Sequence, residues 1–145
     1  MNFELIKWGS KEYETMVELR DRILRKPLGL HYTEEYLAEE KNDILIACYE
    51  RKKIAGCCVL RTFSDEVIQL KQMAVDEKLQ GRGIGTKIIA FAEQTAREVG
   101  HLRLFMHARK VAVPFYQKCG YQVRGDEFEE VGIPHLMMTK ELSEQ

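Results

Sequence analysis

The stretch MAVDEKLQGRGIGTKII, Met73 to Ile89, places three glycines at alternate positions between two apolar runs. Gly81, Gly83 and Gly85 each cost conformational entropy when the chain folds. A simple turn rarely needs three glycines at this spacing. The pattern therefore indicates a backbone that must come very close to another group.

The segments on either side of the glycines predict a strand and a helix. Before them, VIQLKQMAV (67–75) alternates apolar and polar residues, as a strand does. After them, apolar residues recur at helical spacing from Ile84 to Val99, and Gly100 ends the helix. A loop that enters a helix exposes unpaired backbone N–H groups, and the helix dipole favours an anion there. Residues 80–86 therefore predict an anion-binding loop.

The rest of the chain alternates between the two periodicities. Strand patterns occupy 3–8, 43–50, 53–63, 102–107, 121–123 and 135–142. Helices are expected after Ser10, after Thr33 and over 111–119. The order β-α-α-β-β-β-α-β-α-β-β predicts an α/β fold built on one sheet, in a single domain over 1–145.

Composition narrows the class of protein. Lys and Arg (22) nearly balance Asp and Glu (23), so no basic excess points to nucleic acid or to a membrane surface. The first residues lack the apolar core of a signal peptide, and no run approaches membrane-spanning length. The spacing of the four cysteines includes no CxxC metal pair, and it indicates reduced thiols in a cytoplasmic protein. The cysteines are Cys48, Cys57, Cys58 and Cys119. If Cys57 and Cys58 lie on a strand, they point to opposite faces.

Glycine-rich loops of this kind bind three types of nucleotide ligand. A P-loop needs a Lys-Ser/Thr pair after its last glycine and a wider spacing than GRGIGTK provides. A dinucleotide-binding fold needs GxGxxG and an acidic residue about 20 residues onward. Here the spacing is GxGxG, and HLRLFMH (101–107) contains no acid. The remaining candidate is the pyrophosphate of coenzyme A.

Two motifs carry a family resemblance. QGRGIG, Gln80 to Gly85, matches the Q/R-x-x-G-x-G/A pattern of the GCN5-related N-acetyltransferase (GNAT) family. The wider stretch over 73–89 resembles that family's core strand, loop and helix, and AVPFYQKCGY (112–121) resembles its later helix, loop and strand. With the element order, the resemblance covers essentially the whole chain. It implies the GNAT fold, a single mixed and mostly antiparallel sheet flanked by helices, and transfer of an acetyl group from acetyl-CoA to an amine.

The resemblance also assigns residues to the coenzyme. The strand beside a bulge would pair with the pantetheine arm and donate an N–H to the oxyanion, while the loop amides would hold the pyrophosphate, with charge-assisted contacts from Arg82. His107 occupies the position at which many members carry Asn, and it can make the same kind of polar contact with the coenzyme. The residues so assigned are Met73, Ala74, Val75, Gln80, Gly81, Arg82, Gly83, Ile84, Gly85, Thr86 and His107. No metal is implied.

Two residues are candidates for proton transfer. Tyr116 falls at the position of the family's general acid, where a phenol can protonate the departing thiolate. IPHLMMTKEL (133–142) resembles the last strand of a narrower group, the glyphosate N-acetyltransferase-type members, in which a histidine acts on the acceptor amine. His135 is thus the candidate base. Core packing remains open for both residues, and an ordered water is an alternative to His135.

The same narrower group suggests the acceptor. LRDRILRKPLGL (19–30) resembles its early helix, and its anion-holding positions map to Arg25, Lys71 and Arg109. Lys71 and Met73 are expected to share one face of a strand. Cations that converge on a pocket pair with a carboxylate or phosphate, so the expected acceptor is a small amine with an acidic group. Lys71 replaces the group's arginine, which weakens bidentate recognition, and solvated surface charge is the alternative for all three.

Other functions stay open at this level. A peptide or protein amine could be the acceptor, and a non-catalytic acetyl-CoA sensor could use the same fold. Many members of the family pair as dimers, so a homodimer is possible.

Overall fold

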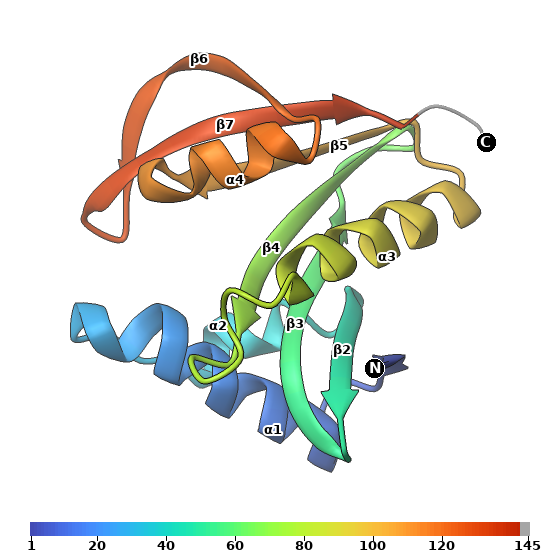
Figure 1. Ribbon diagram of the computed structural model, residues 1–145, viewed down its shortest axis with the longest axis vertical. Helices are drawn as coiled ribbons and strands as arrows, with labels where there is room; N and C mark the ends of the chain where they lie inside the picture. The colour runs from blue at the N-terminus through green and yellow to red at the C-terminus, as the bar shows by residue number, and fades with distance from the viewer. Residues whose placement is uncertain (143–145) are drawn as a thin grey trace.

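The computed structural model describes residues 1–142 and forms one seven-stranded sheet with helices on both faces (Figure 1). The strands are β1 (Asn2–Ile6), β2 (Ile44–Glu50), β3 (Lys53–Thr62), β4 (Val67–Val75), β5 (Arg103–Arg109), β6 (Gln122–Glu130) and β7 (Ile133–Glu141). The α-helices are α1 (Lys11–Arg20), α2 (Glu34–Ala38), α3 (Ile84–Glu98) and α4 (Val113–Lys118). A π-helix, η1 (Asp21–Arg25), and two 3-10 turns, η2 (Lys26–Leu28) and η3 (Lys110–Ala112), complete the elements.

The sheet is mixed and mostly antiparallel, as predicted. Its strand order is β1-β2-β3-β4-β5-β7-β6, so the last strand lies between β5 and β6. The pair β4–β5 is parallel, and the other five pairs are antiparallel. The element order expected from the sequence is therefore confirmed.

Two hydrophobic clusters lie on the two faces of the sheet. Cys57 packs with Tyr13 and Met16 of α1, whereas Cys58 packs with the cluster that includes Ile84 and Ile88 of α3. The two cysteines thus point to opposite faces, as strand alternation predicts. All four cysteines are free.

A glycine lets α3 approach the sheet. A Cβ on Gly56 would lie 2.6 Å from Cδ1 of Ile88 and 3.0 Å from the carbonyl oxygen of Ala74. A larger residue at position 56 would therefore displace the Ile88 side chain of α3 and crowd the Ala74 carbonyl of β4. Gly56 was not singled out from the sequence.

The helix boundaries follow their capping residues. The Ser10 hydroxyl accepts from the Tyr13 N–H at 3.2 Å, and the Thr33 hydroxyl accepts from the Tyr36 N–H at 3.1 Å. Gly100 adopts a φ of 96°, as expected at a helix end. Val99, the last residue of the predicted apolar stripe, is exposed. Within residues 1–142, no helix is long and apolar enough to cross a membrane.

Strands β4 and β5 separate part-way along their length. Their pairing runs from Val67 opposite Arg103 to Leu70 opposite Met106. Beyond that point, residues 71–75 of β4 pair with β3 alone, and β5 pairs on with β7. Figure 1 shows the two strands diverging from the end where they are paired. The sheet is therefore open between β4 and β5.

Candidate active site

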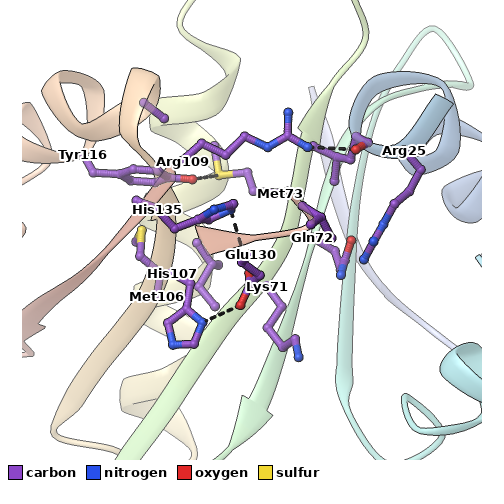
Figure 2. Close-up of a pocket in the computed structure, with 15 residues that line it drawn as sticks. Arg25, Lys71, Gln72, Met73, Met106, His107, Arg109, Tyr116, Glu130 and His135 are labelled. Atoms are coloured by element: carbon purple, nitrogen blue, oxygen red, sulfur yellow. Dashed lines mark hydrogen bonds and ion pairs between the residues drawn. The ribbon is translucent and has the colours of Figure 1, made fainter. Parts of the chain in front are cut away.

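A cavity of about 260 Å³ lies where β4 and β5 separate, and fifteen described residues line it (Figure 2). It gathers predicted site residues that are far apart in the sequence. These are Arg25, Lys71, Met73, His107, Arg109, Tyr116 and His135. Figure 2 shows Tyr116, His135, Glu130 and His107 following one another along one side, with Arg25 on the opposite side beyond Gln72.

Tyr116 points from α4 into the cavity. Its hydroxyl lies 3.6 Å from Sδ of Met73, and its side chain is almost fully buried. Burial raises the pKa of Tyr116 above the ordinary value of a phenol. The hydroxyl therefore stays protonated near neutral pH, which is the form that a proton donor requires.

His135 points from β7 into the same space with a defined tautomer. Its Nδ1 lies 2.9 Å from the carbonyl oxygen of Ile133. A carbonyl can only accept a hydrogen bond, so Nδ1 carries the proton. In the neutral ring, Nε2 is then the free acceptor.

Glu130, at the end of β6, lies between two histidines. Its Oε1 is 2.9 Å from Nδ1 of His107, and its Oε2 is 3.8 Å from Nε2 of His135. His107 was expected to contact the coenzyme, and in the structure its ring pairs with this carboxylate. Glu130 itself was not predicted from the sequence.

A hairpin turn explains where Glu130 points. Val131 and Gly132 have φ angles of 48° and 78°, the pattern of a type I′ turn that closes the β6–β7 pair. The resulting register places Phe128 opposite His135 and Glu130 opposite Ile133. Because alternate residues share a face, Glu130 and His135 lie on the same side. The signal in the sequence was the Val-Gly turn, although valine is an unusual residue for it.

The three predicted cations line the cavity, each with other contacts. The Arg25 guanidinium lies 4.7 Å from the ring centroid of Tyr32 and 5.4 Å from that of Tyr36. Arg109 donates to the carbonyl oxygen of Leu24 at 2.8 Å, which fastens η1 to β5. Burial, with the nearby Arg61 charge, lowers the pKa of Lys71.

A β-bulge at Gln72 interrupts the alternation of β4. Gln72 has a φ of 54°, and the β3 register passes from Ala74 opposite Cys57 to Lys71 opposite Val59. Lys71, Gln72 and Met73 consequently all line the cavity, rather than Lys71 and Met73 alone.

Three hydrogen bonds hold this bulge. The Tyr32 hydroxyl donates to Oε1 of Gln72 at 2.5 Å, and Nε2 of Gln72 donates to the Tyr36 hydroxyl at 2.6 Å. The Cys57 thiol donates to the Gln72 carbonyl oxygen at 3.7 Å. A left-handed, non-glycine residue is thus fixed next to Met73.

The glycine loop beyond β4 suits an anion. Gly81 and Gly83 have φ angles of 84° and 79°, which only glycine adopts readily. Helix α3 begins at Gly83 with no side-chain cap, so the amides of its first turn have no intrahelical acceptor. Gly85 is closely packed, since a Cβ there would lie 3.1 Å from Cζ of Phe115 and 3.2 Å from Cε of Met73, and these side chains would have to shift slightly. The loop therefore fits the diphosphate that the sequence suggested.

The side chains of this loop have their own partners. Nε2 of Gln80 donates to the Val75 carbonyl oxygen at 3.1 Å, which ties the loop back to β4. The Arg82 guanidinium is 3.0 Å from the carboxylate of Glu50 on β2. Ile84 is buried in the core, and Thr86 is exposed. The loop thus offers a phosphate mainly its backbone.

Comparison with known proteins identifies the family. Residues 22–142 match the model described as an acetyltransferase (GNAT) domain. The chain belongs to the GNAT family. The GNAT resemblance and fold expected from the sequence are both confirmed.

The curated relatives differ in how much of their length is matched. Bacillus subtilis (strain 168) N-acetyltransferase YjcF is 31% identical over 124 residues, covering 85% of this chain and 88% of YjcF. YyaT of the same organism is 37% identical over 75 residues, covering 52% of this chain. The chain spans about half the length of the first curated relatives that it matches, 51% of YyaT and 55% of a Xenopus tropicalis relative.

Solved GNAT structures share the whole fold. A GNAT family acetyltransferase from Elizabethkingia anophelis, crystallised with acetyl-CoA bound, superposes with a TM-score of 0.77 at 20% identity. The superposition covers 97% of this chain and 97% of that one.

Proposed function

We propose that this GNAT protein is an acetyl-CoA-dependent N-acetyltransferase whose acceptor is the amine of a small molecule that also carries an acidic group. One observation carries the proposal. The opening between β4 and β5 brings Tyr116, His135 and three cations together beside the stretch of β4 that has no strand partner on the β5 side and leads to the glycine loop.

The coenzyme would lie along β4 and the loop after it. The first-turn amides of α3 and the left-handed Gly81 and Gly83 suit the diphosphate. Residues 73–75 lack a strand neighbour on the β5 side, so an extended pantetheine arm could pair there as an added strand does. The Met73 N–H, next to the bulge, is the candidate donor to the thioester oxygen as that oxygen gains charge. The Elizabethkingia relative, solved with acetyl-CoA, supports this choice of ligand.

The ammonium nitrogen must lose two protons during the transfer, and the thiolate must gain one. The acceptor amine is normally protonated and loses its first proton before it attacks, and Nε2 of His135 is the proposed acceptor. The nitrogen then forms a bond to the acetyl carbon and loses its second proton to solvent, the carbon–sulfur bond breaks, and the thiolate takes a proton. Tyr116, buried and protonated, is the proposed donor.

The charge of the cavity supports an acidic acceptor. Arg25, Lys71 and Arg109 line it, and Glu130 is the one carboxylate among its fifteen described lining residues. Arg109 uses one N–H on Leu24, but a guanidinium has further donors for an anion. In the resemblance to the glyphosate N-acetyltransferase-type group, Arg25 and Arg109 keep the anion-holding positions and Lys71 replaces an arginine, which supports the same class of acceptor.

The proposal is tested by measuring thiol release from acetyl-CoA with a panel of amines. The panel pairs small amino acids with uncharged amines and with lysine-containing peptides of similar size. We expect turnover with small amines that bear an acidic group. Turnover confined to peptides would favour a protein acceptor, and tight coenzyme binding without turnover of any amine would favour a sensor.

A further inference from the structure

We propose that Glu130 and His135 together bind the ammonium group of the acceptor, and that the acceptor is therefore a zwitterion. Its ammonium would lie between these two side chains, and its anion would face Arg25 and Lys71. This inference rests on the proposed function and names the class of its acceptor more narrowly.

Two hydrogen-bond acceptors face each other in the cavity. Nε2 of His135 and Oε2 of Glu130 are 3.8 Å apart, too far for a hydrogen bond between them. The Ile133 carbonyl fixes the proton of the neutral ring on Nδ1, so neither facing atom has a hydrogen to donate. A nitrogen with two N–H bonds can reach both, because 3.8 Å is less than twice a hydrogen-bond length of about 2.9 Å. An ammonium group satisfies both acceptors and also supplies the proton that His135 removes.

The Glu130 carboxylate is held in place although the residue is half exposed. Nδ1 of His107 binds its other oxygen at 2.9 Å. The His107 ring is itself flanked by Phe128, with ring centroids 5.0 Å apart, and by Phe105 at 6.1 Å. The carboxylate oxygen that faces His135 is thus fixed by its partner, which reduces the entropy lost on binding a ligand.

Positive and negative side chains lie at different places around the cavity. A second depression of about 430 Å³ adjoins the first and shares Arg25, Lys71, Glu130 and His107 with it. Glu130 lies on the β6 side next to His135, and Arg25 lies on the opposite side (Figure 2). A ligand that meets both sides carries a positive and a negative group on one small skeleton. Amino acids and aminophosphonates have this form.

The test compares Glu130→Gln with Glu129→Gln. The first change keeps the shape of the side chain and removes its charge, and the second removes the same charge from the exposed neighbour. Both variants are assayed with small amino acids and with the matching amino acid amides, which keep the ammonium and lose the carboxylate. We expect Glu130→Gln to raise KM for the amino acids by about 10-fold, with kcat and the affinity for coenzyme A nearly unchanged. Glu129→Gln should change KM by less than about 2-fold.

The carboxylate end is tested by the wild-type protein alone. It should prefer each amino acid over its amide by about 10-fold in kcat/KM, because the amide leaves Arg25 and Lys71 without an anion. Equal use of acids and amides would overturn the zwitterion and, with it, the acidic group of the proposed acceptor. An unchanged KM in Glu130→Gln, or a loss confined to kcat, would overturn the role of Glu130 in binding, while the proposed function would stand.

A direct measurement keeps the inference testable if the wild type acetylates none of these amines. Nitrogen-15 NMR of the histidine rings should show His135 with its proton on Nδ1. Addition of an amino acid should then shift its Nε2 resonance in the wild type, and Glu130→Gln should need about 10-fold more amino acid for the same shift. No shift in the wild type would overturn the inference. A shift without turnover would support the binding site and contradict the proposed function.

Discussion

At the scale of single residues, burial determines what Tyr116 can do. The hydroxyl belongs to a buried side chain and has Met73 Sδ as its neighbour, and the raised pKa keeps its proton in place. We expect Tyr116→Phe to lower kcat by about 10²- to 10⁴-fold, because the thiolate would leave unprotonated. Calorimetry should find the affinity for coenzyme A nearly unchanged.

A matched control exists for this substitution. Tyr49 has a buried hydroxyl without a hydrogen-bond partner among the described residues, so Tyr49→Phe removes the same atom away from the cavity. Its kcat should stay within about 2-fold of the wild type. If Tyr116→Phe behaves like Tyr49→Phe, Tyr116 is a packing residue and not the acid.

A buried ion pair joins Arg20, at the end of α1, to Glu40, which follows α2. Arg20 and Glu40 are both almost completely buried, and their paired atoms lie 2.8 and 2.7 Å apart, with the Tyr13 hydroxyl donating to the same carboxylate at 2.6 Å. We expect Glu40→Ala to lower the free energy of unfolding by about 3–5 kcal/mol, because Arg20 would keep a buried charge without a partner. Urea unfolding measures the loss.

The exposed neighbour Glu39 provides the comparison. Glu39→Ala should change the free energy of unfolding by no more than about 0.5 kcal/mol. Equal effects from Glu39→Ala and Glu40→Ala would mean that water reaches Arg20 and that the pair is not buried.

At the scale of elements, the bulge in β4 sets the position of Met73. Gln72 adopts a left-handed φ of 54° and is held by Tyr32 and Tyr36. At most strand positions an alanine variant is more stable than a glycine variant. Here we expect the free energy of unfolding of Gln72→Ala to be lower than that of Gln72→Gly by about 1 kcal/mol. Both substitutions remove the side-chain hydrogen bonds to Tyr32 and Tyr36. Alanine still has a Cβ, which is strained at a left-handed φ, whereas glycine is not strained there.

Thermal and urea unfolding of the two Gln72 variants test this order. Gln72→Ala should also show the lower kcat, because a relaxed bulge moves the Met73 amide. An alanine variant more stable than the glycine variant would show that the bulge is not held in the left-handed region.

The sequence predicts the elements better than the details inside them. Apolar periodicity and the caps at Ser10, Thr33 and Gly100 were enough to place the strands and helices in order. The bulge was expected only from the family resemblance. The π-helix at Asp21–Arg25 was not expected, because it depends on contacts with distant residues, such as the bond from Arg109 to the Leu24 carbonyl.

The same distinction applies to the candidate site. Motif positions predicted Tyr116, His135 and the cations, and the fold brings them into one cavity. Glu130 was missed because its role depends on the register of a hairpin whose turn residue, Val131, is atypical. Arg20 was missed because a charged side chain on a helix is usually solvated, and only Glu40, twenty residues away, makes its burial possible.

At the scale of the whole molecule, buried thiols make stability depend on alkaline pH. Burial raises the pKa of Cys48 from 9.0 to about 11 and that of Cys57 from 9.0 to about 12. Above about pH 9 the unfolded chain loses these protons while the folded chain keeps them, so stability is full below that pH and falls as pH rises. We expect the free energy of unfolding to fall by about 1.4 kcal/mol per pH unit for each thiol.

Urea unfolding in reducing buffer, from about pH 7 to about pH 10, measures this slope. Cys48→Ala should reduce the slope by the contribution of one thiol, about 1.4 kcal/mol per pH unit, whether or not it changes the free energy of unfolding at neutral pH. A free energy of unfolding that stays constant over this range would contradict the burial of the thiols.

The central claim is that backbone amides at the start of α3 bind the diphosphate of coenzyme A beside the cavity. The most direct test is a calorimetric titration of coenzyme A into the wild type, Gly83→Val and Gly9→Val. Gly83 and Gly9 have nearly equal φ angles, 79° and 78°, so the two valines impose the same backbone strain, but only the first lies in the loop. We predict binding to the wild type and to Gly9→Val, and loss of binding in Gly83→Val. Equal affinity in all three proteins, or no binding to the wild type, would contradict the account.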